Sequence, residues 1–126
     1  MKLLLDTHAL LWLAEGSAQL STPACQAIRR ADECLVSIAS LWEMAIKCAI
    51  DKLRLEPSYE EWVRERLPRE LRILPVRPEH LVDYVRLPLH HRDPFDRLFV
   101  AQARCEKLTL LSADPAMRAY DVPVIW

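Results

Sequence analysis

Glycine is almost absent from this chain, which has one among 126 residues. Phosphate-binding loops of the Walker and Rossmann types need several glycines, because the backbone must approach the phosphates closely. Nucleotide sites of these types are therefore excluded. Cysteine is also scarce, and the four cysteines form no CxxC pair and have no zinc-finger spacing with histidine. We interpret them as free thiols in a reducing cytosol.

An excess of charge and a long apolar run are missing as well. The formal net charge is −1 and the pI is about 6.4, so any contact with nucleic acid must depend on local basic patches. No apolar run approaches the ~20 residues of a membrane span, and one lysine precedes the short apolar stretch at the N-terminus. We expect a soluble, cytoplasmic protein with no membrane partner, folded as one domain over residues 1–126.

Short apolar runs alternate with stretches of helical periodicity, and prolines or small polar residues mark the helix starts. We predict strands at 2–5, 34–37, 72–76, 108–112 and 123–126, and helices at 8–15, 23–30, 38–50, 58–67, 78–85, 94–107 and 115–120. The strands are apolar enough to be covered on both faces, which predicts an α/β fold with a central parallel sheet. Asp121, between a helix and a strand, is a candidate for left-handed backbone.

Four acidic side chains stand where a shared site is expected. Asp6 and Asp114 follow two apolar strands, at the edge where open α/β sheets bind ligands. Glu43 and Asp96 interrupt apolar helical stretches, where an unpaired charge is costly. Hard divalent cations prefer such oxygen ligands. Each acid also has an alternative role outside a shared site: Asp6 and Asp114 could cap the helices that follow them, and Glu43 could face solvent.

Several segments resemble the PIN-domain ribonucleases, and among these the VapC-type toxins of type II toxin-antitoxin systems. They are LLDTHALLW at 4–12, SLWE at 40–43, RDPFDRLFVAQA at 92–103 and LSAD at 111–114. They span most of the chain in the order and spacing of the family. The resemblance implies a three-layer α/β/α sandwich, a pocket that binds Mg²⁺ or Mn²⁺, and endonucleolytic cleavage of RNA. It also implies a small antitoxin partner, and a homodimer is compatible with it.

The resemblance assigns catalytic roles to the four acids. Asp6 and Asp96 match the positions that hold metal most directly. Asp114 and Glu43 match the remaining acidic positions, where they bind metal directly or through water, or orient the nucleophile. Cleavage of a phosphodiester needs an activated water, a stabilised leaving oxygen and positive charge at phosphorus, and one or two metal ions provide all three.

Five neighbouring residues are candidates for substrate binding. Thr7 and Ser112 are small hydroxyls beside the acids, able to bond a carboxylate, a phosphate or the local backbone. Asp93 precedes a proline in the position of a helix cap, so capping and a direct role in the site both remain open. Arg92 and Arg97 are candidates for phosphate contacts, and Arg97 alternatively pairs with a pocket carboxylate.

Histidines and tryptophans near these motifs are ambiguous. His8 is expected to pack locally, whereas His90 and His91 lie in a polar loop from which either could touch substrate or metal-bound water. Trp12 and Trp42 are candidates for stacking on an RNA base, although core or interface packing is more common.

The family resemblance also suggests where an antitoxin would bind. Helices after the first two strands commonly form the antitoxin groove in PIN toxins. An apolar surface near Leu11, Trp12, Trp42 and Ile46 would suit that purpose.

Other functions remain open at this level. A PIN-type nuclease of RNA processing needs no antitoxin. A receiver-like phosphotransferase would use Asp6 as phosphoacceptor, but the segment lacks the paired early aspartates of such sites. A non-catalytic module could bind an arginine of a partner in its acidic pocket.

Overall fold

Alternating apolar runs and helical stretches fold into a parallel sheet that is covered on both faces. A computed structural model describes all 126 residues. The strands are β1 (Lys2–Leu5), β2 (Glu33–Ser37), β3 (Arg72–Leu74), β4 (Thr109–Leu111) and β5 (Val124–Ile125). They lie in the order β3-β2-β1-β4-β5, and every neighbouring pair is parallel. The predicted α/β fold with a central parallel sheet is confirmed.

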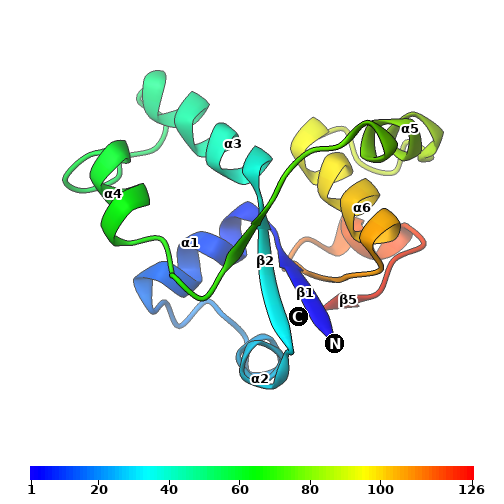
Figure 1. Ribbon diagram of the computed structural model, residues 1–126, viewed down its shortest axis with the longest axis horizontal. Coiled ribbons are helices and arrows are strands. Elements are labelled where there is room, and N and C mark those ends of the chain that lie inside the picture. The colour runs from blue at the N-terminus through cyan, green and yellow to red at the C-terminus, as the bar shows by residue number, and fades with distance from the viewer.

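Helices form the two outer layers. They are α1 (Thr7–Glu15), α2 (Thr22–Arg30), α3 (Ile38–Ala49), α4 (Tyr59–Glu65), α5 (Pro78–Arg86) and α6 (Pro94–Glu106), with a 3₁₀ helix η1 (Pro115–Ala119). Helices α1 and α2 lie on one side of the strands, and α5 and α6 lie on the other (Figure 1). This arrangement is the three-layer sandwich that the resemblance implied. None of the helices is both long and apolar enough to cross a membrane.

The central strand β1 is buried on both faces. Successive side chains of a strand point to opposite faces of the sheet. Leu4 accordingly packs in one core with Phe99 of α6, while Leu3 and Leu5 pack in another with Ala9 of α1. All three leucines are fully buried, and burying each side chain contributes about 1.5–3 kcal/mol. The strand therefore holds the residue that follows it on a rigid base.

Two local expectations need correction. The segment expected as a helix over 115–120 is a short 3₁₀ helix. Asp121 does not have left-handed backbone, because η1 ends at Tyr120 in an extended conformation. Lys107, with φ 56°, has left-handed backbone between α6 and β4 instead, and its amide donates to the Ala103 carbonyl to close the helix. The other predicted strands and helices are present, with bounds that shift by only a few residues.

The carboxyl ends of three central strands lead into helix starts. Asp6 follows β1 and caps α1, with Oδ1 2.8 Å from the Ala9 amide. Ser37 ends β2 and caps α3, and Asp114 follows β4 and caps η1. Because the strands are parallel, these three caps lie along one edge of the sheet. That edge carries the acidic residues singled out from the sequence.

Candidate metal centre

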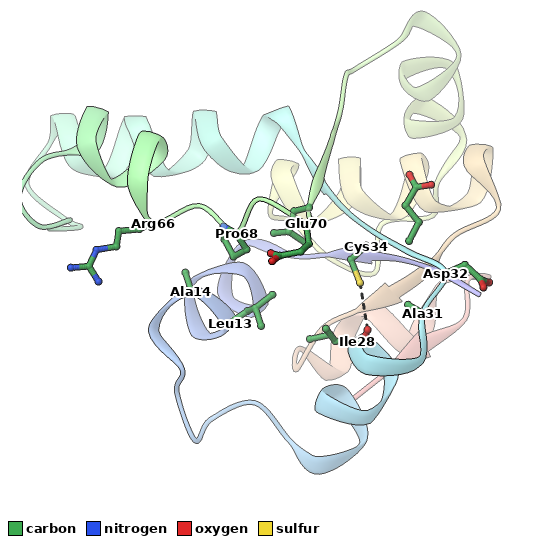
Figure 2. A pocket seen from close by; sticks show the side chains of 11 residues that line it. Leu13, Ala14, Ile28, Ala31, Asp32, Cys34, Arg66, Pro68 and Glu70 are labelled. Carbon is green, nitrogen blue, oxygen red and sulfur yellow. Dashed lines mark hydrogen bonds between the residues drawn. The ribbon is translucent and has the colours of Figure 1, made fainter.

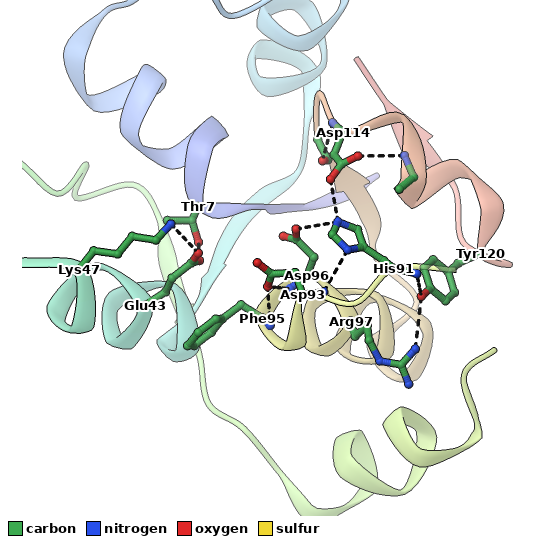
Figure 3. Close-up of polar contacts among 12 residues, drawn as sticks. Thr7, Glu43, Lys47, His91, Asp93, Phe95, Asp96, Arg97, Asp114 and Tyr120 are labelled. Carbon is green, nitrogen blue, oxygen red and sulfur yellow. Dashed lines mark hydrogen bonds and ion pairs between the residues drawn. The ribbon is translucent and has the colours of Figure 1, made fainter. Parts of the chain in front are cut away.

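Four secondary-structure elements bring the predicted acids to the carboxyl edge of the sheet. Asp6 comes from the end of β1, Asp114 from the end of β4, Glu43 from α3 and Asp96 from the first turn of α6. In Figure 3, Asp96 lies between Glu43 on one side and Asp114 on the other. The expected proximity of the acids is thus found, although each one has a different set of partners.

Asp6 is the most enclosed of the four acids, with 4% of its surface exposed. Burial raises the pKa of Asp6, and hydrogen bonds from the Ser112 side chain and the Ala9 amide oppose that rise without cancelling it. Ser112 is also buried, and its hydroxyl accepts a hydrogen bond from the Asp114 amide at 3.1 Å. Ser112 therefore links the acids that follow β1 and β4.

Asp96 lies in a strongly perturbing electrostatic environment. Burial raises the pKa of this carboxyl to about 7, with further contributions from the charges of Asp93 and Asp6, while His91 opposes the rise. A carboxylate among like charges is destabilised unless a proton or a cation joins it. The fold thus holds Asp96 where a bound cation would relieve repulsion.

His91 joins Asp96 to Asp114 within the site. Its Nε2 atom lies 2.8 Å from Oδ2 of Asp114 and 3.1 Å from Oδ2 of Asp96. Burial by itself would raise the pKa of Asp114, but hydrogen bonds from the Ala116 amide and from His91 outweigh burial and lower it. His91, Asp96 and Asp114 offer ligand atoms that all lie within 4.8 Å of one another.

Glu43 is held at the other side of the site. Its Oε1 atom accepts a hydrogen bond from the Thr7 hydroxyl at 2.5 Å, and its Oε2 atom lies 3.0 Å from Nζ of Lys47. Thr7 therefore orients Glu43, as one of the alternatives for this hydroxyl expected. We did not single out Lys47 from the sequence, although its spacing of four residues from Glu43 on one helix favours such a pair.

The residues around Asp96 have separate tasks. Asp93 caps α6, with Oδ1 accepting from the amides of Phe95 at 2.8 Å and Asp96 at 3.1 Å. This is the capping alternative, and its charge still acts on Asp96. Arg92 is exposed beside them and remains available to a phosphate.

Arg97 does not take either of its expected places. It is 7% exposed, and its guanidinium donates to the carbonyl oxygens of Pro88 and Tyr84 and to the Tyr120 hydroxyl. No carboxylate contacts it. Arg97 therefore ties the chain before α6 to the core, and its burial removes it from the surface that RNA could reach.

The other histidines also have defined positions. His8 is exposed and stacks on Trp12, with ring centroids 5.6 Å apart, and its charge acts on both Asp6 and Asp114. His90 packs against Tyr120 at 5.1 Å. The histidine that enters the site is His91, which the sequence did not distinguish from His90.

The donor set fits a hard divalent cation. Carboxylate oxygens predominate, and no thiol belongs to the cluster, which favours Mg²⁺ or Mn²⁺ over softer metals. Asp6 and Asp96 are the acids whose pKa values are raised, so they gain most from a nearby positive charge. These observations fit the two residues that the resemblance assigned to metal.

The largest cavity lies away from the acids, on another side of the sheet. It has a volume of about 460 Å³, and its lining includes Leu13 of α1, Cys34 of β2 and Arg66 (Figure 2). It contains none of the residues predicted for the site. The acidic site instead lies at the carboxyl edge of the sheet, where Asp96 and Asp114 are partly exposed.

Comparison with known proteins agrees with this geometry. The family model described as PIN domain matches residues 3–123. Ribonuclease VapC22 of Mycobacterium tuberculosis is 31% identical over 121 residues, which cover 95% of this chain and 92% of that protein. This chain belongs to the PIN-domain family. The family that the sequence motifs indicated is therefore confirmed.

Solved structures show the same PIN fold. VapBC2 from Rickettsia felis bound to a promoter DNA fragment aligns with a TM-score of 0.72 at 13% identity, covering 98% of this chain and 97% of that chain. A toxin-antitoxin complex from Klebsiella pneumoniae aligns with a TM-score of 0.67 at 20% identity, covering 98% and 95%. Mycobacterium tuberculosis VapC20, described as a Sarcin-Ricin loop cleaving toxin, has a TM-score of 0.62 at 17% identity and covers 95% of each chain.

Proposed function

We propose that this PIN domain is a toxin-type endoribonuclease that cleaves RNA phosphodiester bonds with a bound Mg²⁺ or Mn²⁺ ion. The observation that carries the proposal is the state of Asp96, whose pKa is raised to about 7 by burial and by neighbouring carboxylates. A protein that holds acids together against their repulsion gains binding energy when a cation arrives. The similarity to a ribonuclease supports RNA as the substrate.

Each acid has a place in the proposed reaction. Asp6 and Asp96 would hold the ion directly. Glu43, oriented by Thr7 and Lys47, would hold it through water or orient the attacking water. Asp114 completes the negative edge and is held in place by its cap on η1.

The bound ion would activate water and neutralise charge that develops at the phosphoryl group. The other tasks belong to the chain. Ser112 fixes Asp6 relative to Asp114, and the exposed Arg92 is placed to contact an RNA phosphate near the acids. The cytoplasm, where RNA is available, is the location we propose.

An apolar groove beside the acids supports an antitoxin partner. It has a volume of about 370 Å³ and is lined mainly by apolar side chains of α3, α5 and α6, among them Trp42, Ile46, Leu81 and Phe95. Trp42 is 62% exposed and packs edge-on against Phe95 at 5.3 Å. Exposed apolar patches of this kind mark interaction sites.

The groove corrects part of the expected antitoxin surface. Trp42 and Ile46 line it, as expected, but Leu11 packs against the core beneath α1 and α3. Trp12 packs against Trp126 with ring centroids 5.5 Å apart, and it does not line the groove. We therefore propose that the docking surface extends from α3 toward α5 and α6.

The groove lies next to the site in sequence, which suggests the chemistry of its occupant. Phe95 lines the groove, and the next residue, Asp96, belongs to the site. A partner with an apolar segment followed by a basic residue would fill the groove and neutralise the carboxylates. We propose a small antitoxin with this chemistry, which would block access of RNA to the site.

RNA cleavage tests the enzymatic part of the proposal. The purified, antitoxin-free chain is incubated with a mixed structured RNA and Mn²⁺, Mg²⁺ or EDTA, beside an equally purified Asp6→Asn variant. We expect cutting that requires metal and is lost in the variant. Equal activity in both preparations would show a contaminating nuclease, and silence in both would favour a non-catalytic module that binds a partner through its acids.

Binding to the proposed antitoxin tests the groove. Tryptophan at the centre of an interface often contributes 2 kcal/mol or more, so Trp42→Ala should weaken binding by about 30-fold. Trp12→Ala is the matched control, because this ring lies outside the groove. Unchanged binding by Trp42→Ala would contradict the assignment, and a changed oligomeric state of the isolated chain would identify the groove as a homodimer interface.

A further inference from the structure

The imidazole of His91 lies between the carboxylates of Asp96 and Asp114. Its hydrogen bonds determine whether a cation can bind in that space. Nε2 is within hydrogen-bond distance of Oδ2 of Asp96 and Oδ2 of Asp114 (Figure 3). Two-metal nuclease sites place a second cation about 3.5–4 Å from the first, shared by neighbouring carboxylates. The imidazole lies where a cation shared by Asp96 and Asp114 would bind.

The backbone determines which ring nitrogen carries the hydrogen. The Asp93 amide lies 3.1 Å from Nδ1 of His91, and an amide can only donate. Nδ1 must therefore offer its lone pair, which places the hydrogen of the neutral ring on Nε2. Histidines that bind metal show the opposite arrangement, because their second ring nitrogen donates its N–H to an acceptor. His91 thus presents an N–H group to the carboxylates and not a ligand lone pair.

The loop that carries His91 is fastened to the core. The His91 amide donates to the Tyr120 hydroxyl at 2.8 Å. That hydroxyl also receives a hydrogen bond from the buried Arg97, which donates to the Pro88 carbonyl at 3.0 Å as well. These long-range contacts hold both ends of the loop, so the imidazole has a defined position against the acids.

Asp114 and Asp96 differ in how many of their carboxylate oxygens already have a hydrogen-bond donor. On Asp114, Oδ1 accepts from the Ala116 amide at 2.9 Å and Oδ2 contacts His91, so both oxygens already have donors. On Asp96, His91 contacts Oδ2 alone, which leaves Oδ1 free of the imidazole. The charge of Asp6 also contributes to the raised pKa of Asp96.

We propose that His91 takes the place of a second cation, so that the site binds one divalent ion, held by Asp6 and Asp96. The inference rests on the proposed metal-dependent function and adds the number of ions. His91 is a positioning residue in this scheme. Its Nε2–H donates to Oδ2 of Asp114 and lies 3.1 Å from Oδ2 of Asp96, so the ring fills the space between the two carboxylates where a two-metal site would hold a second cation.

Counting bound Mn²⁺ tests this directly, by calorimetric titration together with electron paramagnetic resonance. The wild-type chain should bind one Mn²⁺ that is lost in Asp96→Asn, and pulsed measurements should detect no directly bound imidazole nitrogen. His91→Ala should bind two. His90→Ala is the matched control, because this neighbouring ring packs on Tyr120 and should leave one ion bound.

The outcomes separate this inference from the proposed function. Two ions in the wild-type chain, a nitrogen signal from imidazole, or a single ion in a folded His91→Ala variant would each overturn it. The two wild-type measurements need no variant and decide the matter even where His91→Ala fails to fold. RNA cleavage with two bound ions would overturn this inference alone, whereas the absence of Mn²⁺ binding in every form would overturn the proposed metal-dependent function as well.

Discussion

Acidic residues lie at both the amino ends and the carboxyl ends of the strands, but their surroundings differ. At the start of β2, the Glu33 carboxylate lies 2.5 Å from Nε of Arg72 and 3.9 Å from Nζ of Lys2. The amino group of Met1 pairs with the neighbouring Asp32. The pKa of Asp32 is lowered by that amino group. At the carboxyl edge, burial raises the pKa values of Asp6 and Asp96, whereas hydrogen bonds from Ala116 and His91 lower that of Asp114.

This difference shows how a functional cluster is distinguished from structural charges. Acids that pair with basic side chains of the fold do not need a bound cation to offset their charge. Acids that are buried together, with few basic side chains between them, represent free energy that a bound cation can recover. The largest cavity is lined by Asp32 and Glu33, at the amino ends of the strands. Cavity size alone would therefore place the functional site at the wrong end of the sheet.

The largest effect should come from removing one acid at each edge. Asp96→Asn should lower RNA cleavage by about 100-fold or more, because a bound metal contributes several kcal/mol to the transition state and each 1.36 kcal/mol is tenfold. Asp32→Asn should leave the rate unchanged. Initial rates with Mn²⁺ measure both, and a comparable loss in the two variants would remove the distinction between the edges.

Metal binding should stabilise the chain through the carboxyl edge. At about 100 times its dissociation constant, an ion adds about 2.7 kcal/mol to the free energy of unfolding. Thermal melting with and without Mn²⁺ should therefore show a rise of several degrees that Asp96→Asn loses. An equal rise in the parent and in Asp96→Asn would mean that Asp96 is not a ligand.

The metal-free protein should respond to pH in the opposite sense to a salt-bridged acid. The pKa of Asp96 is raised from 3.8 to about 7, so the folded state binds this proton more tightly than the unfolded chain. Its contribution is favourable below pH 4 and is lost as the pH rises through about 7. Asp96→Asn should thus stabilise the metal-free protein at pH 8, on the order of 2 kcal/mol after allowance for its partly exposed side chain.

Urea unfolding in EDTA measures that difference. The gain from Asp96→Asn should shrink as the pH is lowered from 8 to 5, where the parent carboxyl is protonated. A destabilised variant at pH 8 would contradict the raised pKa, since it would show that the charged carboxylate has favourable partners in the fold.

The smallest effect on stability is expected at the amino ends of the strands, where Glu33 begins β2. Glu33→Gln breaks ion pairs whose basic partners, Lys2 and Arg72, are exposed, and exposed pairs contribute about 0–1 kcal/mol. Its melting temperature should fall slightly, and its RNA cleavage and Mn²⁺ binding should match the parent. A loss of Mn²⁺ binding in this variant would show that the two edges are coupled.

Local patterns predicted the strands and helices well, because these features are set within short segments, whereas the roles of the four acids stay a prediction. Strand β1 and its cap Asp6 follow directly from an apolar run and the polar residue after it. The motifs indicated the PIN-domain family and its fold, and both are confirmed by the family match and the parallel sheet.

Tertiary contacts decided what local patterns left open. His91 could not be separated from His90 by sequence, because its position depends on Tyr120, 29 residues away. Arg97 was expected near a phosphate or a carboxylate, but burial and the carbonyl oxygens of Tyr84 and Pro88 determine its position. Contacts of this range are made by folding and have no periodic signature in the chain.

The most direct test of the central claim is a crystal of the chain soaked in Mn²⁺ and measured for anomalous scattering. We predict one strong peak at the carboxyl edge, bonded to carboxylate oxygens of Asp6 and Asp96. The account would be contradicted by a peak at Asp32 and Glu33 instead, or by no peak among the acids at the carboxyl edge while the fold is intact.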